Sequence, residues 1–187
     1  WLSPHPIKSD YPISAIITAL EIQEGQKVAD VGSGDGRLTF PIAKHVGRQG
    51  RVFAVDLSDM DKFTVNMKSG FGRWYPQVTA VTGKIDDPLL PANTMDVVLM
   101  VISYHEMTDY QAMLAGVLKA MKPGARLGII DVPGSRFTNR AAYSGDHFIP
   151  KEVVIEDATA AGFRYLRAVD PASPPGSFYF VIFEKAE

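Results

Sequence analysis

The strongest constraint on the fold is the repeated alternation of short apolar runs with helical segments along a chain of 187 residues. The apolar runs are rich in Val, Ile and Leu without polar–apolar alternation, which is typical of strands buried on both faces of a sheet. Strand and helix in alternation predict an open, mainly parallel, doubly wound α/β sheet of the Rossmann-like kind. The predicted strands span 27–31, 51–56, 77–83, 95–103 and 125–131, and the predicted helices span 13–21, 37–46, 59–68, 110–121 and 151–161.

The C-terminal part follows a different pattern. The stretches "GFRYLRAVD" and "SFYFVIFEK" both read as strands, and only a Pro-rich turn separates them. Two strands joined so closely predict an antiparallel hairpin. No linker or internal repeat is visible, so we expect a single domain over 1–187. Because the sequence begins with Trp rather than Met, we also expect that an upstream part has been removed.

Composition excludes several classes of function. The net charge of −2 gives no global field for nucleic acid or an anionic membrane surface. The absence of cysteine excludes disulfides, thiolate metal sites and cysteine nucleophiles. No run of 18 apolar residues occurs, so we expect no membrane insertion. We expect a cytoplasmic protein that acts on a small molecule.

A glycine-rich stretch, "KVADVGSGDGRL", follows the first predicted strand and places Asp30 before Gly32, Gly34 and Gly36. In such sheets ligands bind outside the carboxyl ends of the strands, where bare glycine lets the main chain approach them. Asp56 ends the second predicted strand about 20 residues later and is well placed to accept hydrogen bonds from ribose hydroxyls. The G-x-G-x-G spacing departs from the dinucleotide pattern G-x-G-x-x-G, and Asp30 would repel a pyrophosphate. A cationic ligand, an ammonium or a sulfonium, fits better than NAD.

Five blocks of the sequence, in this order, resemble the motifs of class I S-adenosylmethionine-dependent methyltransferases: "VADVGSGDG", "VFAVD", "GKIDD", "MDVVLMVISYHEM" and "MKPGARLGIID". More narrowly, the chain resembles a poorly characterised bacterial group of predicted small methyltransferases. The resemblance implies S-adenosylmethionine as cofactor and a seventh strand inserted antiparallel beside the fifth. It also implies an N-terminal helical segment over 1–24 and an acceptor-side loop over 132–149.

The resemblance also implies which residues bind the cofactor. Asp56 would hold the ribose hydroxyls, and Leu57 would pack on the adenine. Asp86 would accept from the adenine amino group, although Lys84 stands where the family commonly has the acid, so Asp87 is an alternative. The implied set is Asp30, Gly32, Ser33, Gly34, Asp56, Leu57, Ile85, Asp86 and Ile102, with the backbone of Ser103 completing the pocket.

Candidate catalytic residues lie after the fourth predicted strand and before the last predicted helix. His105 is the first candidate for a general base, because an unperturbed histidine titrates near ~6.5; alternatively it is a packing histidine capped by Glu106. His147 would belong to a lid over the acceptor, and Tyr104 would stack on the acceptor or fill space. The catalytic candidates are Tyr104, His105, Glu106 and His147.

A metal site is a weaker alternative. Asp109 and Asp131, together with His105, Glu106 and His147, could offer nitrogen and oxygen ligands. Neighbouring residues of an extended strand point in opposite directions, however, and His105 is next to Glu106. We therefore expect no metal.

The predicted function is methyl transfer from S-adenosylmethionine to a small-molecule acceptor. The segment "SYHE" stands where amino-methylating relatives have Asn/Asp-Pro-Pro-Tyr, which argues against methylation of DNA adenine. The alternative is an accessory or regulatory domain that binds S-adenosylmethionine without methylating. The oligomeric state is left open.

Overall fold

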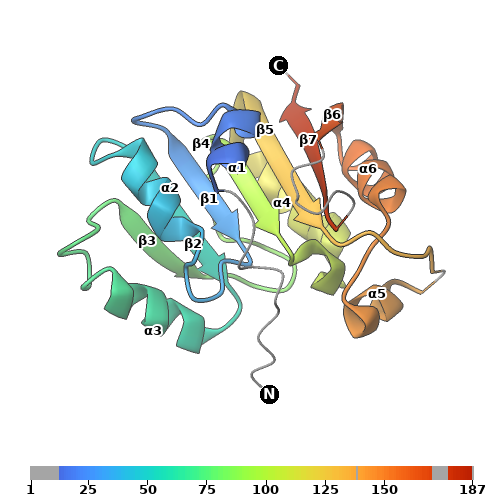
Figure 1. Cartoon of the computed structure of the whole chain (residues 1–187), viewed down its shortest axis with the longest axis horizontal. Coiled ribbons are helices and arrows are strands. Elements are labelled where there is room, and N and C mark those ends of the chain that lie inside the picture. The colour runs from blue at the N-terminus through green and yellow to red at the C-terminus, as the bar shows by residue number, and fades with distance from the viewer. Residues whose placement is uncertain (1–12, 138, 170–176, 187) are drawn as a thin grey trace.

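Seven strands form one mixed sheet in the order β3-β2-β1-β4-β5-β7-β6 (Figure 1). The structure is a computed structural model that describes residues 13–137, 139–169 and 177–186. Strands β1 to β5 run parallel, and β7 pairs antiparallel with both β5 and β6. The predicted doubly wound sheet, its C-terminal hairpin and the insertion of β7 beside β5 are all confirmed. The strands are β1 (Lys27–Val31), β2 (Arg51–Asp56), β3 (Val78–Thr82), β4 (Met95–Val101), β5 (Met121–Asp131), β6 (Phe163–Val169) and β7 (Tyr179–Lys185).

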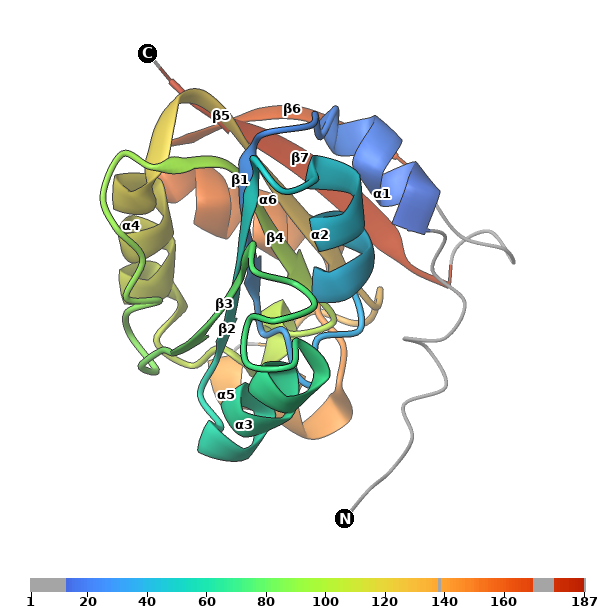
Figure 2. The ribbon, with the colours of Figure 1, turned by 90° about the vertical axis from the view of Figure 1, so that its left-hand side faces the viewer.

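Helices cover both faces of the sheet. Figure 2 shows α1 and α2 on one side of the strands, and α4 and α6 on the other. Consecutive residues of one strand face the two layers, because Val28 packs in the α1–α2 cluster and Ala29 in the α4–α6 cluster. The helices are α1 (Ile13–Leu20), α2 (Thr39–Val46), α3 (Asp59–Lys68), α4 (Tyr110–Ala120), α5 (Arg140–Asp146) and α6 (Lys151–Ala160), with a short 3₁₀ turn, η2 (Tyr104–Glu106).

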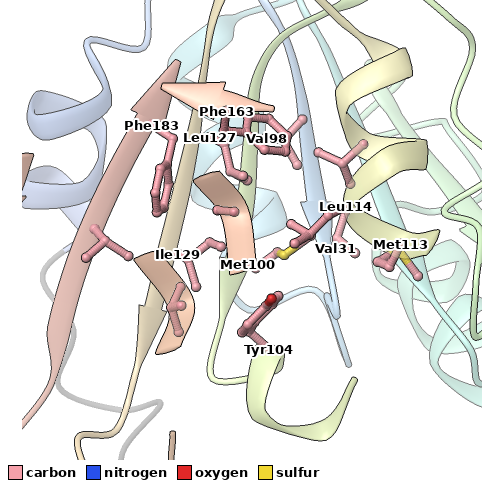
Figure 3. Packing of buried hydrophobic residues seen from close by; sticks show 14 of the residues in the cluster. Val31, Val98, Met100, Tyr104, Met113, Leu114, Leu127, Ile129, Phe163 and Phe183 are labelled. Carbon is pink, nitrogen blue, oxygen red and sulfur yellow. The ribbon is translucent and has the colours of Figure 1, made fainter. Parts of the chain in front are cut away.

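The core under α4 and α6 extends to the carboxyl end of β4. Figure 3 shows Val98, Met100, Leu127 and Ile129 from the sheet packed against Leu114 of α4, with other side chains of the cluster around them. Each fully buried side chain of this size contributes about 1.5–3 kcal/mol relative to its exposed state. This packing fixes the strand ends from which the residues of the candidate site project.

The first turns of α2 and α3 follow ordinary rules for helix N-termini. Ser58 caps α3 by accepting from the N–H of Asp61 at 3.2 Å. Pro41 lies in the first turn of α2, where its missing N–H leaves no hydrogen bond unmade.

The predicted acceptor-side loop over 132–149 is wrong in part, because residues 140–146 form helix α5. Asn139 caps this helix by accepting from the N–H of Ala141 at 3.0 Å. Of the predicted N-terminal segment, residues 1–12 lie outside the described residues. No helix within the described ranges is long and apolar enough to cross a membrane.

Candidate functional site

A pocket of about 140 Å³ opens at the carboxyl ends of β1, β2 and β4. This is the edge of a parallel sheet at which ligands bind, at the point where the strand order reverses. Four residues of the predicted cofactor-binding set line it: Gly32, Asp56, Leu57 and Ile85. The full lining is Val31, Gly32, Val55, Asp56, Leu57, Gly83, Lys84, Ile85, Ser103, Glu106, Met107 and Met113.

Glycine is required at position 32 by the backbone conformation there and by the close approach of Ser103. It has a φ of +79°, and a Cβ built on it would lie 2.4 Å from the Cβ of Ser103. Ser103 is held in place because its hydroxyl donates to the carbonyl of Val31 at 3.1 Å. The glycine therefore lets the chain leaving β4 pass directly over the chain leaving β1. This contact between strand ends is a role that the sequence pattern alone did not reveal.

Asp56 connects β2 to the glycine-rich loop. Its Oδ2 accepts from the N–H of Gly34 at 2.8 Å, and its Oδ1 accepts from the N–H of Ser58 at 3.3 Å. Gly34 has a φ of +52°. The carboxylate thus orders the loop while it lines the pocket.

Asp30 is only 2% exposed and accepts a hydrogen bond of 2.7 Å from the hydroxyl of Thr39, the first residue of α2. The side chain therefore fixes the start of α2 relative to β1. It is not among the residues that line the pocket, and neither are the neighbouring Ser33 and Gly34.

The adenine side of the predicted site is open and apolar. Leu57 and Ile85 are 57% and 51% exposed at the pocket. Asp86 beside them is exposed. Asp87 instead accepts from the N–H of Leu89 at 2.8 Å, and this hydrogen bond stabilises the loop that contains both residues. Both carboxylates that the sequence left open are exposed, so what distinguishes them is the hydrogen bond that Asp87 makes within its own loop.

Strand β4 ends two residues earlier than predicted. Ile102 takes a φ of +51°, which no strand residue adopts, and its N–H donates to Ile130 of β5 at 2.8 Å. The chain then enters the turn η2, which carries Tyr104, His105 and Glu106. Because a 3₁₀ turn does not alternate its side chains as a strand does, the predicted divergence of His105 and Glu106 is wrong.

His105 is 1% exposed and lies between two carboxylates. Its Nδ1 donates to Asp131 at 2.7 Å, and its backbone N–H donates to the other oxygen of the same carboxylate at 3.1 Å. Asp131, at the end of β5, is fully buried. The Nε2 of His105 is buried and has no hydrogen-bond partner, since Oε1 of Glu106 is 3.7 Å away.

Burial alone would lower the pKa of His105, but the hydrogen bond to Asp131 and the nearby charges of Asp131 and Glu106 outweigh it and raise the pKa to about 9. At neutral pH the imidazole is therefore protonated on both nitrogens and positively charged. The predicted base with a pKa near ~6.5 does not fit this environment.

His147 completes this cluster from a distant part of the sequence. It follows α5 in the left-handed conformation, with a φ of +57°, and its Nδ1 lies 4.0 Å from Oε1 of Glu106. The rings of His105 and His147 meet edge to face with 5.7 Å between their centroids. Glu106 and His147 are both about half exposed. The predicted convergence of the three side chains is thus seen, whereas Asp109 lies on the surface before α4.

Tyr104 has a structural environment rather than a catalytic one. Its side chain is fully buried, at the end of the core cluster in Figure 3, and its hydroxyl donates to Asp157 at 3.0 Å. Burial is the main cause that raises the pKa of the Tyr104 hydroxyl. No part of the ring is accessible to an acceptor, so the prediction that Tyr104 contacts the acceptor is not supported.

Arg140 of α5 is a residue that sequence reasoning missed. It pairs with Asp157 at 2.8 Å and donates to the carbonyls of Met107 at 3.1 Å and Tyr104 at 3.3 Å. Its guanidinium also lies 4.0 Å from the ring centroid of Tyr110. Arg140 therefore attaches α5, and with it His147, to the segment that carries His105. The capping residue Asn139 was the one local signal that could have located this helix.

Comparison with known proteins gives consistent matches over most of the chain. A family model described as a methyltransferase domain matches residues 28–124, more than half of the chain. The ubiquinone/menaquinone biosynthesis C-methyltransferase UbiE of Cronobacter sakazakii is 31% identical over 152 residues, which cover 78% of this chain and 59% of that protein. The chain thus spans less than two thirds of the length of this relative.

Solved structures share the fold at lower identity. A SAM-dependent methyltransferase from Aquifex aeolicus superposes with a TM-score of 0.80 at 23% identity, covering 97% of this chain and 93% of that one. The 4+2 cyclase SpnF superposes with a TM-score of 0.78 at 16% identity, covering 93% of this chain and 80% of that one. At these identities the likeness is one of fold.

Proposed function

Because the chain belongs to the class I S-adenosylmethionine-dependent methyltransferases, we propose that it transfers a methyl group from S-adenosylmethionine to a small-molecule acceptor. One observation carries this proposal. The lining of a single pocket includes both the predicted cofactor residues Gly32 and Asp56 and the polar segment at Glu106 and Met107. Cofactor and acceptor would therefore meet in one cavity.

The lining residues fit the chemical parts of S-adenosylmethionine. Asp56 offers a carboxylate to the ribose hydroxyls. The same carboxylate accepts a hydrogen bond from the N–H of Gly34. The exposed side chains of Leu57 and Ile85 offer apolar surface to the adenine ring. We assign Asp86 to the adenine amino group, because Asp87 is engaged by the backbone of Leu89.

The methionine end would lie over the glycine-rich loop. We assign Gly32, Ser33 and Gly34 to main-chain contacts there, and the backbone at Ile102 to the opposite wall. Asp30 is buried behind the loop, so it would act on the ammonium group through its charge and through the position of α2.

When bound, the cofactor supplies an electrophilic methyl group on a sulfonium whose leaving group is neutral. What the chain adds is alignment, which can contribute roughly 7–11 kcal/mol for a well-oriented pair. We assign the holding of the acceptor's polar atom to His105, Glu106 and His147, which stand together beside the pocket. Tyr104 has no part in this assignment.

The first acceptor class to test is a hydroxylated aromatic ring. The named relative is a C-methyltransferase of ubiquinone and menaquinone biosynthesis. Apart from the adenine side, the lining of the pocket includes the apolar residues Met107 and Met113 beside the polar Glu106. An aromatic acceptor with a ring hydroxyl would use both kinds of surface.

A cofactor-binding domain without methylation activity is the second candidate. One observation favours keeping this second candidate: a protein of the same fold is described as a 4+2 cyclase, so the fold does not determine the reaction.

The methyltransferase proposal also includes a cytoplasmic location and the lack of a nucleic-acid partner.

Calorimetry with S-adenosylmethionine, S-adenosylhomocysteine and NAD, followed by a methyl-transfer screen with mass detection, tests the proposal. The screen should cover hydroquinones, phenols, amines and carboxylates. We expect binding of the first two ligands, no binding of NAD, and an increase of one methyl group in at least one acceptor. Binding without transfer to any acceptor supports the second candidate, and binding of NAD alone overturns both.

A further inference from the structure

The cluster of His105, Glu106 and His147 has the composition and spacing of a metal site. One ligand atom from each residue lies within 4.8 Å of the other two. Oε1 of Glu106 is central, 3.7 Å from Nε2 of His105 and 4.0 Å from Nδ1 of His147. Ligands bound to zinc at about 2.1 Å in a tetrahedron lie roughly 3.4 Å apart. The two distances to Glu106 exceed this value by about 0.3 and 0.6 Å, and the two histidine nitrogens, which lie within 4.8 Å of each other, need to approach by at most about 1.4 Å.

An independent observation points to a missing ligand at the same place. The Nε2 of His105 is buried, has no hydrogen-bond partner and faces Glu106. A buried polar atom without a partner costs about 1–3 kcal/mol, so such an atom is uncommon without a reason. A bound cation at this position would supply the partner.

On the opposite side of the imidazole, a carboxylate accepts from the second ring nitrogen, as it does for many metal-binding histidines. Asp131, fully buried, accepts from Nδ1 at 2.7 Å and from the backbone N–H of His105 at 3.1 Å. A carboxylate behind a histidine fixes the tautomer and directs Nε2 toward the metal. Asp131 and Glu106 together would also offset the charge of a bound cation.

The cluster is accessible and adjoins the reaction pocket. Glu106 lines the pocket, and Glu106 and His147 are both about half exposed. An ion can therefore enter from solvent. Three protein ligands leave at least one coordination position open, as in catalytic rather than structural metal sites.

We propose that His105, Glu106 and His147 bind one divalent transition-metal ion, with Zn²⁺ as the expected occupant and Asp131 as the positioning residue behind His105. Two imidazoles and one carboxylate suit zinc and iron(II), whereas magnesium and calcium prefer oxygen ligands. Because Glu106 also lines the pocket of the proposed methyl transfer, the ion would hold an oxygen atom of the acceptor at its open position, and this part rests on the proposed function. The metal-binding claim stands apart from the identity of the acceptor.

The test is direct metal binding to the chelator-treated protein, without cofactor or acceptor. We expect one equivalent of Zn²⁺ to bind with a micromolar or tighter dissociation constant in calorimetry, and Co²⁺ to give visible absorption at the same stoichiometry. His147→Asn should weaken binding about 100-fold or more. Asparagine tolerates the left-handed backbone of this position, so the fold should persist. Asp131→Asn should weaken binding roughly 10–100-fold while leaving the three ligands present.

His45→Gln is the matched control, because His45 lies on α2 and contacts the carbonyl of Ile22 instead. It should bind zinc as the wild type does. Circular dichroism and thermal melting establish that each variant is folded, and Glu106→Gln, at a half-exposed side chain, provides a second ligand variant. The proposal is overturned if wild-type protein binds no stoichiometric metal, or if folded His147→Asn and Glu106→Gln bind it as tightly as wild type. A negative result there leaves S-adenosylmethionine binding untouched, so the two proposals fail separately.

Discussion

Replacing Gly32 by alanine should destabilise the protein through two separable effects. The first is backbone strain: a φ of +79° costs a residue with a Cβ about 1–2 kcal/mol. The second is overlap: the new Cβ would lie 2.4 Å from the Cβ and 2.6 Å from the Oγ of Ser103, whereas carbon atoms in contact prefer about 3.5–4.0 Å. Overpacking of this kind costs typically 1–3 kcal/mol. We therefore expect a loss of about 2–5 kcal/mol in the free energy of unfolding.

Two further variants separate the effects. Gly25 has a φ of +83° and no atom within 4 Å of a built Cβ, so Gly25→Ala should show the strain alone. Ser103→Gly removes the overlapping atoms. By itself it should cost about 1–2 kcal/mol, through its hydrogen bond to Val31 and the freedom of glycine. Combined with Gly32→Ala it should recover the overlap part, a coupling of about 1–3 kcal/mol in a double-mutant cycle.

Urea unfolding of the wild type, the three single variants and the double variant at neutral pH measures these terms. Domains of this kind have about 5–15 kcal/mol of stability, so each single variant should remain folded in buffer. The reasoning is refuted if Gly32→Ala loses no more stability than Gly25→Ala, or if Ser103→Gly is additive with it. Either outcome would mean that the strand ends of β1 and β4 can separate at little cost.

Three other substitutions test the remaining assignments. Asp56→Ala should weaken S-adenosylhomocysteine binding by about 2–3 kcal/mol in calorimetry, through the loss of charged hydrogen bonds; the surface variant Asp109→Ala should not, and equal affinities would remove Asp56 from the site. Tyr104→Phe should cost about 1 kcal/mol of stability in urea and leave turnover unchanged, and a tenfold drop in kcat would return the hydroxyl to the reaction. Thr39→Val removes a hydrogen bond to the buried carboxylate of Asp30 and should cost about 1–3 kcal/mol, so an unchanged midpoint in urea would show that Asp30 does not depend on it.

Much of the fold could be predicted from the sequence because its signals are local. The apolar runs placed β1 and β2 at their observed bounds, and the helix predicted over 59–68 coincides with α3. Few sheet topologies are compatible with strands that are buried on both faces, alternate with helices and end in two close-set C-terminal strands. Helix α5 was missed because "RAAYSGD" contains glycine and serine and shows no apolar periodicity.

Only part of the residue set around the pocket was expected from the sequence, and its contacts were not. Four of the proposed cofactor residues line the pocket, and His105, Glu106 and His147 do come together. The pairing of His105 with Asp131 spans 26 positions, and no local pattern encodes it. The environment of His105 follows from that pairing, which is why its pKa could not be anticipated from the residue type.

Arg140 has a consequence for motion. Its side chain contacts Asp157 on α6 and the carbonyls of Tyr104 and Met107, so three segments share one residue. Segments coupled in this way open as one cooperative unit in hydrogen exchange. The backbone amides of α5 and of residues 104–107 should therefore exchange with a common opening free energy, below that of the strands. In the open form His147 would leave the neighbourhood of His105, so the polar cluster would exist only while this unit is closed.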